Sequence, residues 1–272
     1  MSGQFTNLIR LRSLDQLRSV VEYLNRSLLP AIITRYNSEF GPRYLGRLPN
    51  ESIPTETRRL SEFRTRLGVL IEYGLGITID EFLYDDKEEV YLSFVVNNQY
   101  PDFYVRDQNG NILLRIDFKS LHDESAEKSA RFELPMAQVR TDDDLIAYVA
   151  WQWRRMKLSG YDVIYPHLLE GLFVPAIEIA SERDRRHTSR GGTFTIDGKP
   201  LLVNGNPETN FGKIDRIVDT SRLTSPDLSS TIREFLTFIA RHAQAVALAA
   251  AETVEATPTE DEITPRESPE NR

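Results

Sequence analysis

The chain has 272 residues, of which 40% are apolar and 27% charged, a composition typical of a globular protein of roughly one or two domains. The absence of cysteine excludes disulfides and thiolate chemistry and fits a reducing, cytoplasmic compartment. The four histidines lack zinc-site spacing, the first residues lack a signal-peptide pattern, and no apolar run is long enough to predict a membrane span.

The formal net charge is −8, and much of it lies at the C-terminal end. Residues 252–272 carry seven acidic and two basic side chains, three prolines and few bulky apolar residues. Such a segment buries too little surface to offset its ordering entropy, so we expect a disordered acidic tail. The rest of the chain is then nearly neutral, and its overall acidity does not exclude a nucleic-acid partner.

The first 55 residues predict a helical region. Residues 13–36 place leucine and valine at helical spacing, with Ser13 as N-cap and an interruption at Pro30. Residues 41–54 are rich in glycine and proline and predict a loop.

A second helix is predicted over residues 56–73. Thr55 is a suitable N-cap, and an apolar stripe follows at helical spacing. Gly74 and Gly76 are expected to end this helix.

The centre of the chain changes to strand periodicity. Residues 90–96 predict one strand, and residues 102–107 and 112–120 predict two more that alternate in polarity. The last two flank Asn109-Gly110, and Asn-Gly between alternating runs is the strongest short-range signal for a hairpin.

Residues 142–157 predict a helix that packs on the sheet. Three aspartates begin it, which we interpret as a favourable helix start rather than a second metal site, and arginine and lysine end it. Its apolar positions recur every four residues, at Leu145, Val149 and Trp153. Residues 171–180 then predict a buried strand. The order over residues 56–180 is therefore helix, three strands, helix, strand.

Residues 181–251 form an appended region after this core. A second hairpin is predicted over residues 194–203, an amide-rich loop over 204–213 and a final helix over 230–251. A basic loop is expected to follow the last core strand directly and to be the segment that contacts DNA, through Arg183, Arg185, Arg186, His187 and Arg190. The alternative is an exposed basic loop paired with its own local acids.

The hairpin brings two carboxylates together. If Asn109-Gly110 is a two-residue turn, Asp102 lies directly opposite Asp117 on the neighbouring strand. Like charges so placed repel, which a raised pKa or a bound divalent cation would relieve. Lys119 projects from the same face as Asp117 and suits the stabilisation of charge on a phosphate. The alternative is a hairpin whose polar face is simply hydrated.

Three segments of this chain read acid, any residue, lysine: residues 85–87, 117–119 and 197–199. Only residues 117–119 share adjacent predicted strands with a Pro-Asp pair, at Pro101-Asp102, and fourteen residues separate this pair from Asp117. This combination resembles the signature of the PD-(D/E)xK nuclease superfamily, which includes most type II restriction endonucleases. The resemblance implies an α/β fold with a restriction-endonuclease-like core, and its element order matches the order predicted above.

The resemblance also implies roles. Asp102, Asp117 and the carbonyl of Phe118 would be ligands of Mg²⁺, and Lys119 would position or activate the attacking water. The family often adds a glutamate from the preceding helix, for which we favour Glu72 over Glu62.

The expected function is therefore that of a Mg²⁺-dependent, sequence-specific endonuclease of double-stranded DNA. It would act as a homodimer and work beside a cognate DNA methyltransferase. Two alternatives stay open: a structure-specific repair or junction nuclease with the same core, and a non-catalytic nucleic-acid-binding or protein-binding module.

Overall fold

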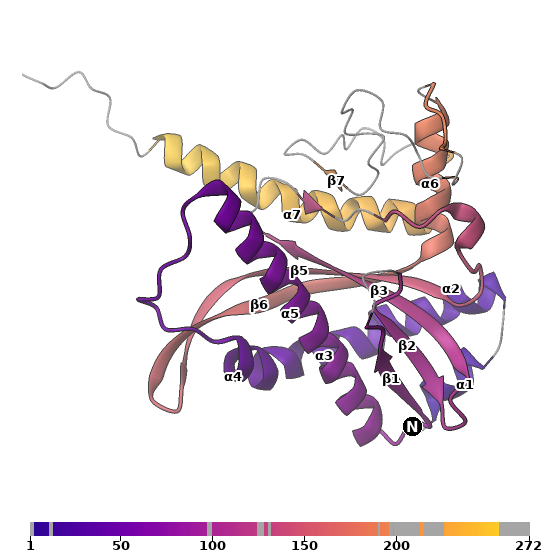
Figure 1. The fold of residues 1–272 in the computed structure, drawn as a ribbon, viewed down its shortest axis with the longest axis horizontal. Coiled ribbons are helices and arrows are strands. Elements are labelled where there is room, and N and C mark those ends of the chain that lie inside the picture. Colours follow the sequence, from indigo (N-terminus) through magenta and orange to yellow (C-terminus); the bar gives the residue numbers. More distant parts are fainter. Residues whose placement is uncertain are drawn as a thin grey trace, which may run out of the picture.

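The computed structural model describes residues 3–10, 13–96, 100–123, 128–129, 132–189, 191–195, 198, 213–214 and 226–255. Its centre is a five-stranded mixed sheet with helices on both faces (Figure 1). The strands run in the order β1-β2-β3-β5-β6, antiparallel except for the parallel pair of β3 and β5. The fold is therefore mixed α/β.

The strands are β1 (Val90–Phe94), β2 (Phe103–Asp107), β3 (Ile112–His122), β4 (Lys128–Ser129), β5 (Asp144–Leu158), β6 (Tyr161–Pro175) and β7 (Lys213–Ile214). The helices are α1 (Gln4–Ile9), α2 (Leu14–Tyr23), α3 (Leu29–Arg35), α4 (Gly41–Leu45), α5 (Thr57–Asp85), α6 (Ala176–Ser189) and α7 (Ser230–Glu255). Two π-helical turns, η1 (Leu24–Leu28) and η2 (Tyr36–Phe40), and the 3₁₀ turn η3 (Met136–Gln138) complete the described elements.

The N-terminal region is more continuously helical than predicted. Ser13 caps α2 as expected, because its Oγ accepts a hydrogen bond from the backbone N–H of Gln16 at 3.2 Å. Pro30 does not end the helix: the widened turn η1 lies just before it, and the chain stays helical through α3, η2 and α4. The loop predicted over residues 41–54 therefore begins with the short helix α4.

Helix α5 begins one residue later than predicted and runs twelve residues further, because Gly74 and Gly76 do not end it. Both glycines are places of close packing inside the helix. A Cβ atom at Gly74 would overlap the ring of Phe40, and one at Gly76 would overlap the ring of Phe103. Glycine stands at these two positions because a side chain would not fit there, rather than because the backbone needs a special angle.

The helix predicted over residues 142–157 is wrong: this segment is the long strand β5. A repeat of four residues also fits a strand, since every second residue shares a face. Leu145, Val149 and Trp153 do share one face, and the residues that alternate with that face lie on the other (Ile146, Tyr148 and Ala150). Helices cover both faces, so the run is continuously apolar. The predicted order of helix, three strands, helix, strand therefore lacks its second helix.

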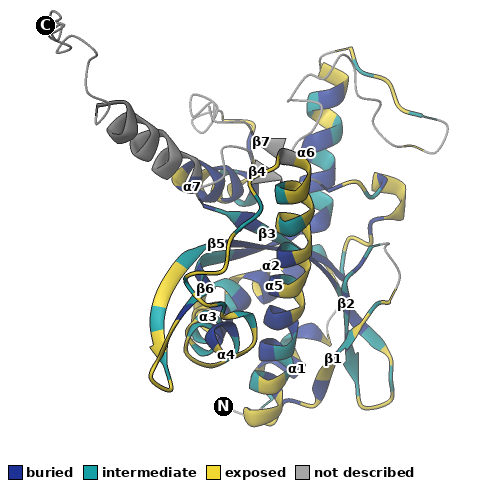
Figure 2. Cartoon of the chain, turned by 60° about the vertical axis from the view of Figure 1, so that its left-hand side comes forward, coloured by how far each residue is buried: buried dark blue, intermediate teal, exposed yellow. Residues whose placement is uncertain are grey.

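The sheet separates two hydrophobic clusters. The first contains buried side chains of α1 to α5 and one face of the sheet, and the second contains the other face with α6 and α7. Figure 2 shows the central strands in the colour of buried residues, while the far end of the β5–β6 hairpin is exposed. The sheet is thus covered on both sides where the predicted site residues lie.

The C-terminal predictions have mixed outcomes. The strand predicted over residues 171–180 ends at Pro175, where α6 begins. The final helix is confirmed as α7. Most of residues 194–213 and all of residues 256–272 lie outside the described residues. Among the helices that are described, none has both the length and the apolarity needed to cross a membrane.

The close contact at Gly76 predicts that a methyl group added there lowers the stability of the protein. We expect Gly76→Ala to lower the free energy of unfolding by about 1–3 kcal/mol, because Phe103 is 1% exposed and has no room to move. Urea denaturation followed by circular dichroism measures this. Ser61→Ala, at an exposed position of the same helix, is the matched control and should change stability by less than about 0.5 kcal/mol. Equal effects of the two substitutions would contradict the packing argument.

Candidate active site

The β2–β3 hairpin has the predicted register at its inner end. Phe103 pairs with Ile116 and Val105 with Leu114, as a two-residue turn requires. Near the turn the register shifts by one residue, so Arg106 pairs with Ile112. A two-residue turn would pair Arg106 with Leu113 instead, so an extra residue of β3 forms a bulge there.

The side chain of Asp107 explains this shift. Its Oδ1 accepts hydrogen bonds from the backbone N–H groups of Asn109 and Asn111, at 2.9 and 2.8 Å. Its backbone N–H donates to the carbonyl of Asn111, and Gly110 adopts φ +81°. The loop is therefore three residues long with glycine in the left-handed position, which is a common hairpin closure.

Asp102 lies just before the first paired residue of β2. The strand ladder begins at Phe103, so Asp102 and Asp117 are not a paired position of the ladder as predicted. Instead, the backbone N–H of Asp102 donates to the carbonyl of Ile116 at 3.0 Å. Its carboxylate accepts from the backbone N–H of Phe118 at 2.7 Å. The two aspartates are still brought close together, on either side of the Asp117–Phe118 peptide.

Glu72 of α5 reaches the same edge of β3. Its Oε1 accepts a hydrogen bond from the backbone N–H of Ser120 at 2.9 Å. Gly68 permits this approach, because a Cβ atom there would lie 2.9 Å from the hydroxyl of Ser120. Glu62, the other glutamate considered, is exposed and pairs with Arg58 at 3.5 Å. The geometry therefore brings Glu72, and not Glu62, to the two aspartates.

Lys119 completes the cluster from the same strand. Its Nζ forms an ion pair with the carboxylate of Asp117 and donates to the carbonyl of Phe118 at 3.2 Å. Both charged side chains are shielded, with 9% of Asp117 and 24% of Lys119 exposed. All the residues that the sequence assigned to catalysis and metal binding thus lie in, or hydrogen-bond to, residues 117–120 of β3 (Glu72, Asp102, Asp117, Phe118 and Lys119).

Burial governs the protonation of these groups. It raises the pKa of Asp117 to about 6, with the charge of Asp102 adding to the effect and Lys119 opposing it. Burial likewise raises the pKa of Glu72 to about 7, again opposed by Lys119. For Lys119, burial acts to lower the pKa, but the neighbouring carboxylates, Asp117 first, outweigh it and raise the pKa. Lys119 is therefore an ammonium ion at neutral pH.

Each of the three carboxylates is followed in the sequence by an aromatic residue. The ring of Phe103 lies 5.1 Å from that of Phe118 and 5.9 Å from that of Tyr73. These three rings follow Asp102, Asp117 and Glu72, respectively. Phe103 and Phe118 are each 1% exposed, so the rings fix the backbone on which the acids are carried. Sequence reasoning missed this pattern, although the repeated acid–aromatic pair was visible.

Sequence reasoning also missed Tyr148. It is opposite Lys119 in the parallel pairing of β3 and β5 and is fully buried. Burial raises its pKa well above the ordinary value, and the charge of Asp117 adds to this. Within the described part of the chain its hydroxyl has no hydrogen-bond partner. A neutral phenol therefore lies on the face that carries Asp117 and Lys119.

The three aspartates expected to start a helix have another role. Asp144 begins β5, is fully buried and forms an ion pair with Arg115 of β3. Its carboxylate also accepts from the backbone N–H of Arg140 at 2.8 Å, and Asp143 pairs with the Arg140 side chain. The Arg115–Asp144 pair joins the strands β3 and β5, and the Arg140 contacts hold the start of β5.

The basic segment expected to contact DNA is not a loop, because residues 181–189 belong to α6. Arg183 is 3% exposed and donates to the carbonyls of Phe132 and Leu134, at 2.8 and 2.9 Å. His187 is fully buried and contacts the carbonyl of Thr193. These two residues hold neighbouring segments in place, and their burial leaves little of either side chain for a contact with DNA.

The other three residues of that prediction differ from these two. Arg185 and Arg186 both form ion pairs with Glu182, and the side chain of Arg185 is 43% exposed. Arg190 lies outside the described residues.

The comparisons with known proteins add no assignment. No family model matches this chain, and no curated protein matches it. The functional argument therefore rests on the geometry of the site.

The raised pKa of Glu72 predicts a pH-dependent stability. Its pKa in the folded state, about 7, lies above its ordinary 4.5, so the folded state binds this proton more tightly. The stability that this carboxyl contributes therefore falls as pH rises from 4.5 to 7. Glu72→Gln keeps an acceptor for Ser120 without the charge. Without divalent metal, we expect this variant to melt a few degrees higher than wild type at about pH 8 and at nearly the same temperature at about pH 5.

Thermal melts across this pH range measure the difference. Glu62→Gln, at an exposed position of the same helix, is the matched control. If Glu72→Gln and Glu62→Gln shift the melting temperature alike at both pH values, the burial argument for Glu72 fails.

Proposed function

We propose that the protein is a Mg²⁺-dependent nuclease that hydrolyses phosphodiester bonds in double-stranded DNA. The observation that carries the proposal is the convergence of three carboxylates and an ammonium group on residues 117–120 of β3. They come from α5, the start of β2 and β3, which are far apart in the sequence. A merely hydrated hairpin face would not draw a glutamate from a helix to the same strand edge.

The donor set fits a hard divalent cation. Among the described residues no three acidic or histidine side chains form a metal cluster. Mg²⁺ does not require one, because it is commonly held by one or two carboxylates, with waters and phosphate oxygens as further ligands. Asp102, Asp117 and the carbonyl of Phe118 would supply the protein ligands. Burial raises the pKa of Asp117 to about 6, and a cation there would stabilise its charged form. When bound, Mg²⁺ supplies charge neutralisation at the phosphate and a more acidic water.

The other two side chains have distinct roles in this proposal. Lys119 is charged, so it stabilises the negative charge that develops on the phosphate and orients a water, rather than acting as a base. Glu72, with a pKa of about 7, is the group suited to accept a proton from that water. Its hydrogen bond to Ser120 holds the carboxylate at the strand edge.

We further propose, as the finer form of this function, sequence-specific cleavage by a homodimer, with a cognate DNA methyltransferase that protects the host DNA. The exposed Arg185 remains available for a DNA contact in this reading, whereas the Arg186 side chain is only 11% exposed. A structure-specific nuclease is the second candidate. The buried positions of Arg183 and His187 favour it, because they leave fewer side chains for reading bases. Discrete fragments from a long DNA would support the first, and cleavage only at junctions or flaps the second.

The proposal predicts which single substitutions abolish hydrolysis. With Mg²⁺ or Mn²⁺ and long double-stranded DNA, Asp117→Asn and Lys119→Met should each lower the cleavage rate by roughly a hundredfold or more, because the first removes a charged metal ligand and the second removes the ammonium group that stabilises charge on the phosphate. Gel electrophoresis of timed digests measures the rate. The chain supplies a matched control in Asp85-Asp86-Lys87, which has the same pattern of residues at the end of α5. Asp85→Asn and Lys87→Met, at the positions that match Asp117 and Lys119, should leave cleavage unchanged.

Two results would contradict the proposal. One is the absence of cleavage of duplex, single-stranded and branched DNA by the wild-type protein with either metal. The other is a cleavage activity that Asp117→Asn leaves intact, which would identify a contaminating nuclease.

A further inference from the structure

The first turns of α5 are the most exposed part of that helix. They carry four arginines, Arg58, Arg59, Arg64 and Arg66, all exposed. Against them stand Glu56 and Glu62, which pair with Arg59 at 3.3 Å and with Arg58 at 3.5 Å, respectively. Neither Arg64 nor Arg66 forms an ion pair with any residue that the structure describes. The segment is locally basic in a chain whose net charge is −8.

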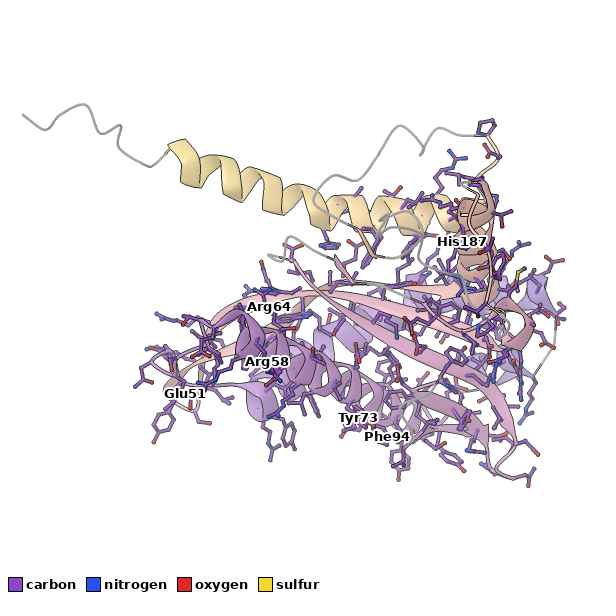
Figure 3. All side chains as sticks on the ribbon, turned by 45° about the horizontal axis from the view of Figure 1, so that its top comes forward. Glu51, Arg58, Arg64, Tyr73, Phe94 and His187 are labelled. Carbon is purple, nitrogen blue, oxygen red and sulfur yellow. The ribbon has the colours of Figure 1, made fainter. Side chains whose placement is uncertain are left out.

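One side of this basic segment leads directly to the acidic cluster. Arg64, Gly68 and Glu72 follow one another at steps of four residues, so they are neighbours along one side of the helix. Gly68 approaches Ser120, and Glu72 accepts from its N–H, so this side faces the end of β3. Arg64 lies one turn beyond the last of these contacts, about 12 Å along the helix from Glu72. Figure 3 shows Arg58 and Arg64 near the free end of α5, away from Tyr73.

From this placement we infer that the first turns of α5, and Arg64 in particular, bind the phosphates that flank the cleaved bond. The inference rests on the proposed function and adds the surface along which the DNA leaves the site. A polyanionic strand held at Phe118 must continue past an edge of the site, and α5 offers unpaired guanidinium groups there. Arginine forms paired hydrogen bonds with phosphate oxygens.

Other partners fit this surface less well. A second copy of the chain, placed symmetrically, would bring the arginine-rich turns against themselves. An acidic protein would match the charge, but it would not explain why the basic side of α5 continues into a site with an ammonium group and three carboxylates. Nucleic acid accounts for both features at once.

The test is DNA binding without hydrolysis. A fluorescein-labelled, mixed-sequence DNA duplex is titrated in EDTA, and fluorescence anisotropy gives the dissociation constant over a series of salt concentrations. We expect Arg64→Gln to weaken binding roughly tenfold and to reduce the slope of log K against log salt by about 0.9, the value for one lost phosphate contact. Arg26→Gln is the matched control. Arg26 is also an exposed arginine, 78% exposed and paired with Glu22, but on the turn η1. It should leave both quantities unchanged.

Three results would overturn the inference. The first is that Arg64→Gln and Arg26→Gln change binding alike. The second is that polyglutamate competes as well as unlabelled DNA of the same charge, which would indicate an acidic protein partner. The third is that light scattering shows a wild-type dimer that Arg64→Gln dissociates while DNA binding is unaltered.

The failure of this inference and the failure of the proposed function can be told apart. Binding is measured without metal, so Arg64-dependent binding by a protein that never cleaves DNA would leave the inference standing and refute the nuclease. In a cleaving protein, Arg64→Gln should raise KM and leave kcat nearly unchanged, because Arg64 does not reach the reacting atoms. If cleavage depends on Asp117, but Arg64→Gln changes neither KM nor DNA binding, only the inference is refuted.

Discussion

The arrangement of the site depends on one backbone constraint at the edge of β3. The paired part of β2 begins at Phe103, so the N–H groups of Phe118 and Ser120 have no strand partner on that side. Buried backbone donors that stay unpaired are costly, and here carboxylates of Asp102 and Glu72 accept from them. The same constraint leaves the carbonyl of Phe118 at this edge, where Lys119 binds it. The acids therefore bind the backbone N–H groups of β3 that β2 leaves unpaired, and this incomplete strand pairing explains the cluster.

The cluster costs stability, which is typical of a site kept for function. Burial of Asp117 and Lys119 removes both charges from water, and their mutual attraction offsets this only in part. Tyr148 adds a buried hydroxyl on the same face. Rigid support comes from the aromatic residues, since Phe103 and Phe118 pack in the first hydrophobic cluster. A packed frame of this kind can hold charged groups in a geometry that they would not adopt alone.

Local signals in the sequence predicted the parts of the site that depend on neighbours along the chain. Asn109-Gly110 and the alternating pattern predicted the hairpin, and the spacing of acids and lysine predicted which side chains would meet. The bulge near the turn depends on the Asp107 side chain, which a rule based on turn length does not include. The sequence of β5 wrongly predicts a helix, because a repeat of four residues fits both a helix and a strand. Only the burial of β5 on both faces identifies it as a strand.

Metal binding at this site is tested most directly by diffraction from crystals soaked in Mn²⁺, with data collected where manganese scatters anomalously. We expect a single strong peak at the site, within bonding distance of carboxylate oxygens of Asp102 and Asp117 and near the carbonyl of Phe118. We also expect that Lys119 Nζ moves away from that carbonyl. A crystal that shows no peak there at high Mn²⁺ concentration, or manganese bound only elsewhere on the molecule, would contradict metal binding at this site.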